Sequence, residues 1–375
     1  MNTAWNDARN ILCIRLDYLG DVLMCTPAIR ALRDAVPQRR LTLLSSPGGA
    51  ALLPHVRELD AALVYEAPWM KSSRPQDGAA LLSMADTLRA QRFDAAVIFT
   101  TYSQSPLPAA MLCHLAGIPL RLACCRENPY QMLSDWVPET EPRQPPRHEV
   151  RRQLDLVATV GGRTADERLS FAVQPADLDW AGRRLAQIGI GPQQPWLLMH
   201  PGATAASRRY PPEHWASALR LLAADGLPTV FTGSGDEGAL VDDIRLQAAV
   251  PAHSLAGEAT LGQLGALISL AAVMVSNNTG PAHIAAALGT PLVDLYALTN
   301  PQHTPRQTPC RVLFHDVPCR DCYKSICPMG HHDCLRKVAP AQVADAVRGL
   351  LETSTALKAR RDDRQGAQQT LQQRL

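Results

Sequence analysis

Short apolar runs alternate with amphipathic stretches along the first half of the chain. The apolar runs have the length and bounding turns of buried strands, and they are Ile11–Leu16, Leu41–Ser45, Ala61–Val64 and Ala95–Thr100. Apolar residues recur at helical spacing over Asp21–Ala35, Ala79–Arg92 and His148–Val160. Strands that alternate with helices are typical of a parallel sheet covered on both faces, so this half predicts an α/β domain.

The same alternation starts again after a linker-like stretch, Ala172–Pro175. The predicted strands of the second half are Trp196–His200, Thr229–Thr232, Val273–Ser276 and Leu292–Tyr296. From Thr353 onward the chain is charged, rich in Gln and without apolar periodicity, which is typical of a frayed tail. We therefore predict an α/β protein with two Rossmann-like domains facing a cleft, over residues 1–173 and 174–352, followed by a polar tail over 353–375.

The composition narrows the class of protein further. A chain of 375 residues is too long for one compact core, which agrees with two domains. The formal net charge of +2 gives no general attraction to nucleic acid, so we expect no nucleic-acid partner. No apolar run reaches the length of about 18 residues that a membrane span needs, and the polar N-terminus lacks the apolar core of a signal peptide. We expect a cytoplasmic protein.

The segment Ser276–His283 follows a predicted strand and opens a predicted helix, Ile284–Leu288, and Gly289 stands where a helix C-cap belongs. A tight loop with Gly and a helix start with Pro direct several backbone N–H groups at one point, where the helix dipole also attracts anions. An ordinary turn between strand and helix is the alternative. The candidate binding residues are Asn278, Thr279, Gly280, Pro281 and His283.

The turn Leu16–Asp21 joins the first predicted strand to the first predicted helix. Ligands of open α/β sheets bind at the carboxyl ends of strands, so this turn is a candidate site. Asp21 lies near the helix start, where it either caps the helix or acts as a base that accepts a hydroxyl proton. Asp17 is a second carboxylate in the same turn, and the turn alone favours neither.

The loop His200–Tyr210 follows the first strand of the second half. Thr204 and Ser207 offer hydroxyl donors, and the guanidinium groups of Arg208 and Arg209 suit phosphate. Two adjacent arginines are often a solvated surface pair, but these follow a strand in the half that also holds the predicted anion loop. We therefore predict that this loop binds a phosphate group.

Thr232–Glu237 is a third loop after a strand. Its Gly-Ser-Gly sequence is a weak signal by itself. Asp236 and Glu237 are either acidic groups that bind a ribose diol, as in other nucleotide sites, or favourable charges in the first turn of a helix.

The ten cysteines are placed unevenly. Six have no ligand-like spacing and are predicted to be small buried apolar residues: Cys13, Cys25, Cys113, Cys124, Cys125 and Cys310. The other four, Cys319, Cys322, Cys327 and Cys334, form a C-x2-C-x4-C-x6-C cluster. Clustered thiols in a cytoplasmic protein favour metal, so a structural zinc site is predicted, with reduced thiols and disulfides as alternatives.

Together these loops resemble glycosyltransferase family 9, the family of the lipopolysaccharide heptosyltransferases. The resemblance covers about Ile11 to Leu351, and its carriers are Arg15-x4-Gly20-Asp21-Val22-x4-Pro27-Ala28, His200-Pro201-Gly202 to Trp215, and Ser276 to His283. The cysteine cluster, with Pro318, Lys324 and Gly330-His331, is similar to the heptosyltransferase II branch.

The resemblance implies a GT-B fold, with the acceptor bound by the N-terminal domain and a nucleotide sugar by the C-terminal domain. It implies an inverting transfer that needs no metal cofactor, with ADP-heptose as donor and a lipopolysaccharide-core glycolipid as acceptor, at the inner face of the cytoplasmic membrane. Asp21 matches the family's proposed base, Arg208 a basic position at the donor diphosphate, and Glu237 an acidic position near the ribose.

One departure from the family pattern bears on the donor. Family members often have Asp where this chain has Asn278, and loss of that charge leaves room for a donor other than ADP-heptose. Two other classes of protein compete. A Rossmann-type oxidoreductase needs a G-x-G-x-x-G turn, whereas Leu16–Asp21 has a single Gly. A non-catalytic protein that binds nucleotide sugars would need no base at Asp21.

Overall fold

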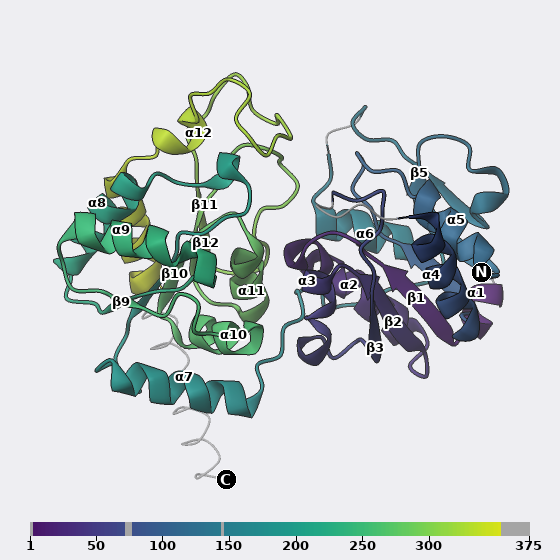
Figure 1. Ribbon diagram of the computed structural model, residues 1–375, viewed down its shortest axis with the longest axis horizontal. Helices are drawn as coiled ribbons and strands as arrows, with labels where there is room; N and C mark the ends of the chain where they lie inside the picture. Colours follow the sequence, from purple (N-terminus) through teal and green to yellow (C-terminus); the bar gives the residue numbers. More distant parts are fainter. Residues whose placement is uncertain (1–2, 72–76, 144–145, 354–375) are drawn as a thin grey trace, which may run out of the picture. The chain divides into compact units, whose positions relative to one another are not determined.

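The computed structural model describes residues 3–71, 77–143 and 146–353, and they form two compact units (Figure 1). Unit 1 contains residues up to Ala172 together with Pro301–His303, and unit 2 contains Val173–Asn300 and the chain from Thr304 onward. Most of the predicted polar tail lies outside the described residues, although helix continues over residues 340–353. No helix in these described ranges has the length and apolar character needed to cross a membrane.

Unit 1 is built on a six-stranded parallel sheet with the order β3-β2-β1-β4-β5-β6. The strands are β1 (Asn10–Ile14), β2 (Arg40–Ser45), β3 (Ala61–Val64), β4 (Ala95–Ile98), β5 (Leu120–Cys125) and β6 (Asp135–Pro138). The helices are α1 (Thr3–Asp7), α2 (Leu19–Ala35), α3 (Pro47–Ala50), α4 (Gly78–Ala90), α5 (Leu107–Leu115) and α6 (Glu149–Ala158). Apolar residues of α4 and α5 cover one face of the sheet, and α2 and α6 pack together as a second layer.

Unit 2 repeats this plan with the order β12-β11-β10-β7-β8-β9. Its strands are β7 (Leu197–His200), β8 (Thr229–Phe231), β9 (His253–Ser254), β10 (Val273–Asn277), β11 (Leu292–Leu295) and β12 (Cys310–Leu313). Its helices are α7 (Pro175–Gln187), α8 (Pro212–Ala223), α9 (Gly238–Ala248), α10 (Leu261–Leu270), α11 (Gly280–Leu288) and α12 (Asp333–Arg336). Apolar side chains of α8, α9 and the helix over 340–353 form the core on one face of the sheet.

Numbered within its own unit, each sheet has the strand order 3-2-1-4-5-6, which is the doubly wound Rossmann order. In such sheets the chain reverses its direction of winding between the first and fourth strands. The loops that follow these two strands diverge, so a crevice forms at their carboxyl ends. The fold therefore predicts one ligand site after β1 and β4 and another after β7 and β10.

Most predicted strands and helices are present, with ends shifted by a few residues. β1 and β4 end two residues earlier than predicted because Arg15, Leu16, Phe99 and Thr100 already belong to the loops. Gly289 is the left-handed C-cap of α11, as predicted (φ 74°). The sequence pattern missed several elements, among them α5, β5 and β12, because they are short or follow loops without a clear periodicity.

The C-cap of α9 gives a test of backbone strain. Ala249 has φ 51°, in the left-handed region that favours Gly, and its N–H donates to the Arg245 carbonyl. Ala249→Gly should therefore stabilise unit 2 by about 0.5–1 kcal/mol. Ala224, the C-cap of α8, is right-handed, so Ala224→Gly is the matched control and should not stabilise. The measurement is the denaturant midpoint of both variants, and equal effects of the two changes would contradict the strain.

Candidate functional site

The turn between β1 and α2 is organised by Arg15, whose guanidinium is fully buried. Its Nη1 lies 2.9 Å from Glu149 Oε1, and its Nη2 lies 3.2 Å from Asp21 Oδ1. Its Nε lies 2.8 Å from Asp17 Oδ2, as an ion pair that is not aligned as a hydrogen bond. Gln153 Nε2 donates to the same Glu149 oxygen at 2.7 Å. One buried cation thus holds three carboxylates from β1–α2 and α6.

Asp21 occupies the first turn of α2, where its Oδ2 accepts the Tyr18 N–H at 3.2 Å. The capping alternative raised from the sequence is therefore observed. Capping leaves the other oxygen paired with Arg15, and the side chain keeps 19% of its exposure. A capping carboxylate at this position is still accessible to a substrate, so capping and proton transfer are compatible roles for Asp21.

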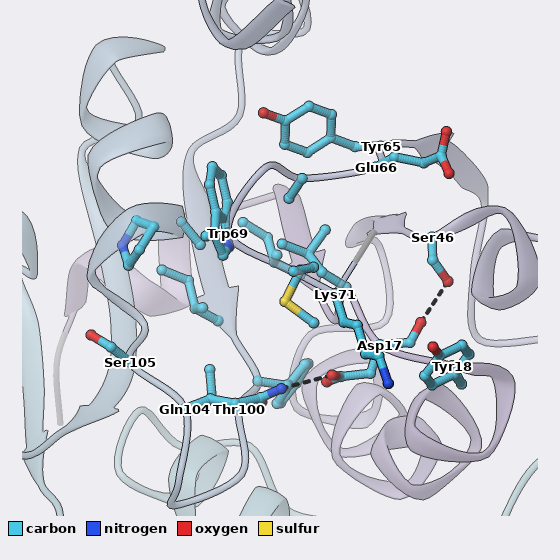
Figure 2. Close-up of a pocket in the computed structure, with 18 of the residues that line it drawn as sticks. Asp17, Tyr18, Ser46, Tyr65, Glu66, Trp69, Lys71, Thr100, Gln104 and Ser105 are labelled. Atoms are coloured by element: carbon cyan, nitrogen blue, oxygen red, sulfur yellow. Dashed lines mark hydrogen bonds between the residues drawn. The ribbon is translucent and has the colours of Figure 1, made fainter. Parts of the chain in front are cut away.

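Asp17 lines a pocket of about 770 Å³ in unit 1, at the carboxyl ends of β1 and β4 (Figure 2). Gln104 Nε2 donates to Asp17 Oδ1 at 2.7 Å. Burial raises the pKa of Asp17 above its usual range, the neighbouring Asp21 and Glu149 charges add to that rise, and Arg15 opposes it. This carboxylate is therefore a better proton acceptor than an ordinary surface Asp at neutral pH.

The pocket combines aromatic side chains with polar ones from several loops. Figure 2 shows Trp69, Tyr65 and Tyr18 around it, and Tyr65 and Trp69 contact edge to face with ring centroids 5.8 Å apart. Its polar or charged members include Ser46, Glu66, Lys71, Thr100, Gln104 and Ser105. Aromatic faces beside hydrogen-bonding groups suit a polyhydroxylated ligand with apolar C–H faces.

In unit 2, the loops after β7 and β10 are joined by Asn277. Its Nδ2 donates to the Pro201 carbonyl at 2.6 Å, and its Oδ1 accepts the Tyr210 N–H at 3.1 Å. The loop after β7 is thereby fixed at both of its ends. The structure thus brings together two of the three loops predicted to bind the donor.

The third loop, after β8, joins the first through Glu237. Its Oε2 accepts the Ser234 N–H at 2.8 Å, and a Cβ on Gly202 would lie 2.0 Å from Glu237 Oε1. Only Gly permits this approach, because any side chain at position 202 would displace the carboxylate. Glu237 also opposes the burial that lowers the pKa of His200, whose Nδ1 lies 3.1 Å from Thr232 Oγ1.

The two adjacent arginines have different environments. Arg209 Nε donates to the Ala203 carbonyl at 2.8 Å, which ties its side chain to its own loop. Arg208 is half-buried, and within the described residues its guanidinium has no hydrogen-bond or ion-pair partner. Thr204 is exposed, whereas Ser207 is buried and donates its hydroxyl to the Lys324 carbonyl at 2.8 Å. Arg208 therefore has its whole guanidinium available to an anion, whereas the Nε of Arg209 is already bonded.

The start of α11 has the form predicted from Ser276–His283. Thr279 is the extended N-cap, and Gly280 and Pro281 open the helix. Ala282 N–H bonds to the Thr279 carbonyl, and among the described residues the N–H groups of Thr279 and Gly280 have no acceptor. Asn278 and His283 are buried beside them. This helix start therefore offers two N–H donors at the switch point of unit 2.

Asp294 in β11 is a fully buried carboxylate, and neither of its oxygens has a hydrogen-bond partner among the described residues. It is in register with Ser276, which is in register with His200, so a buried polar row crosses the carboxyl end of the sheet. Burial raises the pKa of Asp294 to about 8, and the positive charge of Arg208 opposes that rise. Asp294 therefore carries a proton over much of the acid and neutral range.

The four clustered cysteines surround one small cavity of about 20 Å³ together with His331 and Ser207. Cys319 Sγ lies 3.8 Å from His331 Nε2. Over the described residues, no group of three or more His, Cys, Asp or Glu side chains is arranged so that it could hold a metal ion. Zinc binding would require the thiols to move, and it stays a prediction. Of the six other cysteines, five are buried as predicted, and Cys310 is only half-buried.

Several site residues were not found from the sequence. Glu149 is 134 positions from Arg15, and Gln104 is 87 positions from Asp17, so no local pattern connects either pair. Asp294 did carry a signal, because it is the one charged residue in the apolar run Leu292–Tyr296. That signal indicates a polar environment, and the fold places Asp294 in register with Ser276, next to the loops predicted to bind the donor.

The model of glycosyltransferase family 9 (heptosyltransferase) matches residues 81–332. Lipopolysaccharide heptosyltransferase 2 of Escherichia coli K12 is 26% identical over 357 residues, which cover 91% of this chain and 98% of that protein.

Two solved structures share the fold. The glycosyl transferase family 9 protein of Veillonella parvula superposes with a TM-score of 0.78 at 21% identity, covering 92% of this chain and 98% of that one. ADP-heptose lps heptosyltransferase II of E. coli superposes with a TM-score of 0.71 at 24% identity, covering 92% and 99%. The predicted α/β GT-B fold, built from two Rossmann-like units, is confirmed.

The buried carboxyl of Asp294 gives a pH-dependent test. Its pKa of about 8 lies above the ordinary Asp value of 3.8, so its favourable contribution to stability is complete below pH 3.8 and is lost as the pH rises to about 8. The Asp294→Asn variant does not undergo this loss. Between pH 3.8 and about 8, its free energy of unfolding relative to wild type should therefore increase by up to about 1.4 kcal/mol per pH unit. Urea unfolding between pH 5 and 8 measures the effect.

Asp179→Asn is the matched control, because that residue is exposed on α7. Parallel pH profiles for wild type and Asp294→Asn would contradict the raised pKa.

Proposed function

This chain belongs to glycosyltransferase family 9, and from that premise we propose that it transfers heptose from a nucleotide-activated donor to a lipopolysaccharide-core acceptor. It is a glycosyltransferase by family membership. The named activities of its relatives support heptose as the transferred sugar, and the ADP-heptose named for the E. coli structure makes that compound the first donor to test. The observation that carries the proposal is Arg208, which has no hydrogen-bond or ion-pair partner among the described residues and lies on the loop that Asn277 ties to the strand before α11.

The donor diphosphate is proposed to bind at the switch point of unit 2. Arg208 and the N–H groups of Thr279 and Gly280 would meet its negative charge, and that charge grows when the nucleoside diphosphate leaves. The hydrogen bonds of Asn277 to Pro201 and Tyr210 fix the loop that carries Arg208 before the substrate arrives. Donors that need no rearrangement stabilise the transition state more than the ground state.

The ribose and the sugar are assigned to the neighbouring loops. Glu237, held against Gly202, would accept hydrogen bonds from the ribose hydroxyls. Thr204, Arg209, Asn278, Pro281 and His283 complete the proposed donor site, and Ser207, whose hydroxyl donates to the Lys324 carbonyl, supports it from behind. Asn278 in place of the common Asp keeps a group that can donate to or accept from a sugar hydroxyl, and it leaves another nucleotide sugar as the alternative donor.

The acceptor is proposed to bind in the pocket of unit 1. Trp69 and Tyr65 would stack on the C–H faces of core sugars, and Lys71 would pair with an anionic substituent of the core. The acceptor hydroxyl would then approach the Asp17–Asp21 turn, since Asp17 and Tyr18 of this turn line the pocket. This assignment gives unit 1 the acceptor and unit 2 the donor.

Transfer is proposed as a single displacement with inversion. The acceptor oxygen forms a bond to the anomeric carbon while the bond from that carbon to the diphosphate breaks. Asp21 accepts the hydroxyl proton. Asp17, whose pKa is raised, shares the buried Arg15 with Asp21 and so affects the charge around Asp21. A divalent cation has no part in this scheme, because Arg208 and the helix start supply the positive charge.

The proposed acceptor is a glycolipid, so the enzyme would work at the inner face of the cytoplasmic membrane as a peripheral protein. The competing function is non-catalytic binding of nucleotide sugars. Such a function would require the loops of unit 2 but would not require the carboxylate pair bound to Arg15. Turnover of an authentic donor and acceptor distinguishes the two.

The carboxylate pair gives the first test of mechanism. Asp21→Asn retains the cap and should lower turnover by about 100-fold or more, the usual scale for loss of a general base, while donor affinity stays within about twofold. Asp17→Asn should lower turnover less, because Asp17 affects Asp21 through the shared Arg15 and does not itself accept the proton. The measurement is kcat with ADP-heptose and a truncated core acceptor, with the melting temperature as a check on folding. A larger loss for Asp17→Asn would move the base to Asp17.

Arg208 gives the second test. Arg208→Ala should weaken ADP binding in calorimetry and lower kcat together, by about tenfold or more each, because a charge-assisted contact to diphosphate is lost. Arg220→Ala is the control, since Arg220 lies on α8 and bonds to the Gln247 carbonyl. Activity should persist in EDTA. Unchanged ADP affinity, or loss of activity in EDTA that magnesium restores, would contradict the proposed chemistry.

A further inference from the structure

A cysteine-rich loop over residues 318–334 packs directly against the turn that carries Arg208. The turn is a single 3-10 turn, Ala206–Arg208. Its middle residue, Ser207, donates its N–H to the Ser325 carbonyl at 3.0 Å and its hydroxyl to the Lys324 carbonyl at 2.8 Å. Ser207 is only 5% exposed. Two hydrogen bonds therefore attach the cysteine-rich loop to the residue that precedes Arg208.

The cysteine-rich loop is itself attached to the chain that follows β11. Asp321 N–H donates to the Leu298 carbonyl at 2.8 Å, and Tyr323 N–H donates to the Thr299 carbonyl at 2.7 Å. These two bonds hold the first half of the loop, and Ser207 holds the next two residues, Lys324 and Ser325. The cysteine-rich loop is thus a bridge between the end of β11 and the Arg208 turn.

The thiols lie at the centre of this bridge. Cys319, Cys322, Cys327 and Cys334 line the small cavity that Ser207 and Thr299 also line. The cavity has room for about one water molecule, so a bulky group on any of these sulfurs cannot fit without moving the loop. Motion of the loop would reach Ser207 through its two hydrogen bonds.

We propose that Ser207 is a positioning residue for Arg208, and that the cysteine-rich loop controls nucleotide affinity through it, so that covalent modification of the loop thiols weakens donor binding. This inference rests on the proposed function, because it assumes that Arg208 meets the donor diphosphate. It gives Ser207 a role behind the site, where its hydroxyl hydrogen is already bonded to Lys324.

The four loop thiols are half-buried, as is Cys310, whereas Cys13, Cys25, Cys113, Cys124 and Cys125 are buried. Burial raises the pKa of Cys13, Cys113 and Cys310 to about 12 and that of Cys124 to about 11, so these thiols stay protonated and unreactive at neutral pH. An alkylating reagent should therefore select the cysteine-rich loop.

The first experiment is a double-mutant cycle read by calorimetry with ADP, and with UDP and GDP as alternative probes. Ser207→Ala should weaken nucleotide binding by about tenfold, the scale of a lost buried hydrogen bond. In an Arg208→Ala background the same change should have no further effect, because Ser207 acts only through Arg208. Ser269→Ala is the control, since its hydroxyl bonds to the Ala266 carbonyl within α10, and it should leave affinity unchanged.

The second experiment needs no mutation. N-ethylmaleimide adds its alkene carbon to a thiol sulfur, forming a C–S bond at the expense of the C=C π bond, and the other carbon takes up the thiol proton. Modified wild type should bind ADP at least tenfold more weakly at an unchanged unfolding temperature, with adducts confined to the cysteine-rich loop by peptide mass spectrometry. Modified Arg208→Ala should show no added loss.

The outcomes distinguish failure of the proposed function from failure of this inference alone. Wild type that binds none of the three nucleotides overturns the proposed function. Wild type that binds a nucleotide, with Ser207→Ala and maleimide-treated protein binding it equally well, overturns this inference and leaves the proposed function intact. An equal loss from Ser207→Ala in both backgrounds also overturns it, because Ser207 would then act independently of Arg208.

Discussion

The buried guanidinium of Arg15 is the interaction on which the acceptor side of the site depends. It lies at the end of β1 and pairs with Asp17 and Asp21 of the following turn and with Glu149 of α6. A buried cation is costly to desolvate unless its partners are well placed, and loss of one partner of such a network typically costs about 3–5 kcal/mol. The network therefore fixes the geometry of the turn more than it adds stability.

The same network sets the chemistry of the turn. Three carboxylates share one cation, so negative charge remains in excess and contributes, after burial, to the raised pKa of Asp17. Gln104, from the loop after β4, fixes the orientation of that carboxylate. The two loops of the switch point thus meet on one side chain, which is what the reversal of winding at β1 and β4 makes possible.

Unit 2 has the same strand order, but the groups at its switch point are positively charged or N–H donors, whereas those of unit 1 are carboxylates. Its loops are tied to one another by Asn277 and by the contact between Gly202 and Glu237, and this leaves Arg208 and a helix start without partners in the described residues. A preformed group of donors is suited to a diphosphate, because no protein hydrogen bond has to break when the ligand binds. The cysteine-rich loop belongs to this arrangement through Ser207.

By itself, the sequence determined the two α/β repeats, the loops at the strand ends and the family, because each depends on local periodicity or on residues within a few positions of one another. It could not show how the environments of Asp17 and Asp21 differ, or those of Arg208 and Arg209. Those differences depend on Glu149, on Gln104 and on the Ala203 carbonyl, two of which are distant in sequence. Only the tertiary structure placed the cysteine-rich loop on Ser207 and buried Asp294 where no described residue offers it a hydrogen bond. Both facts arise from packing between segments that no local pattern connects, and burial, which changes the pKa values, exists only after the chain has folded.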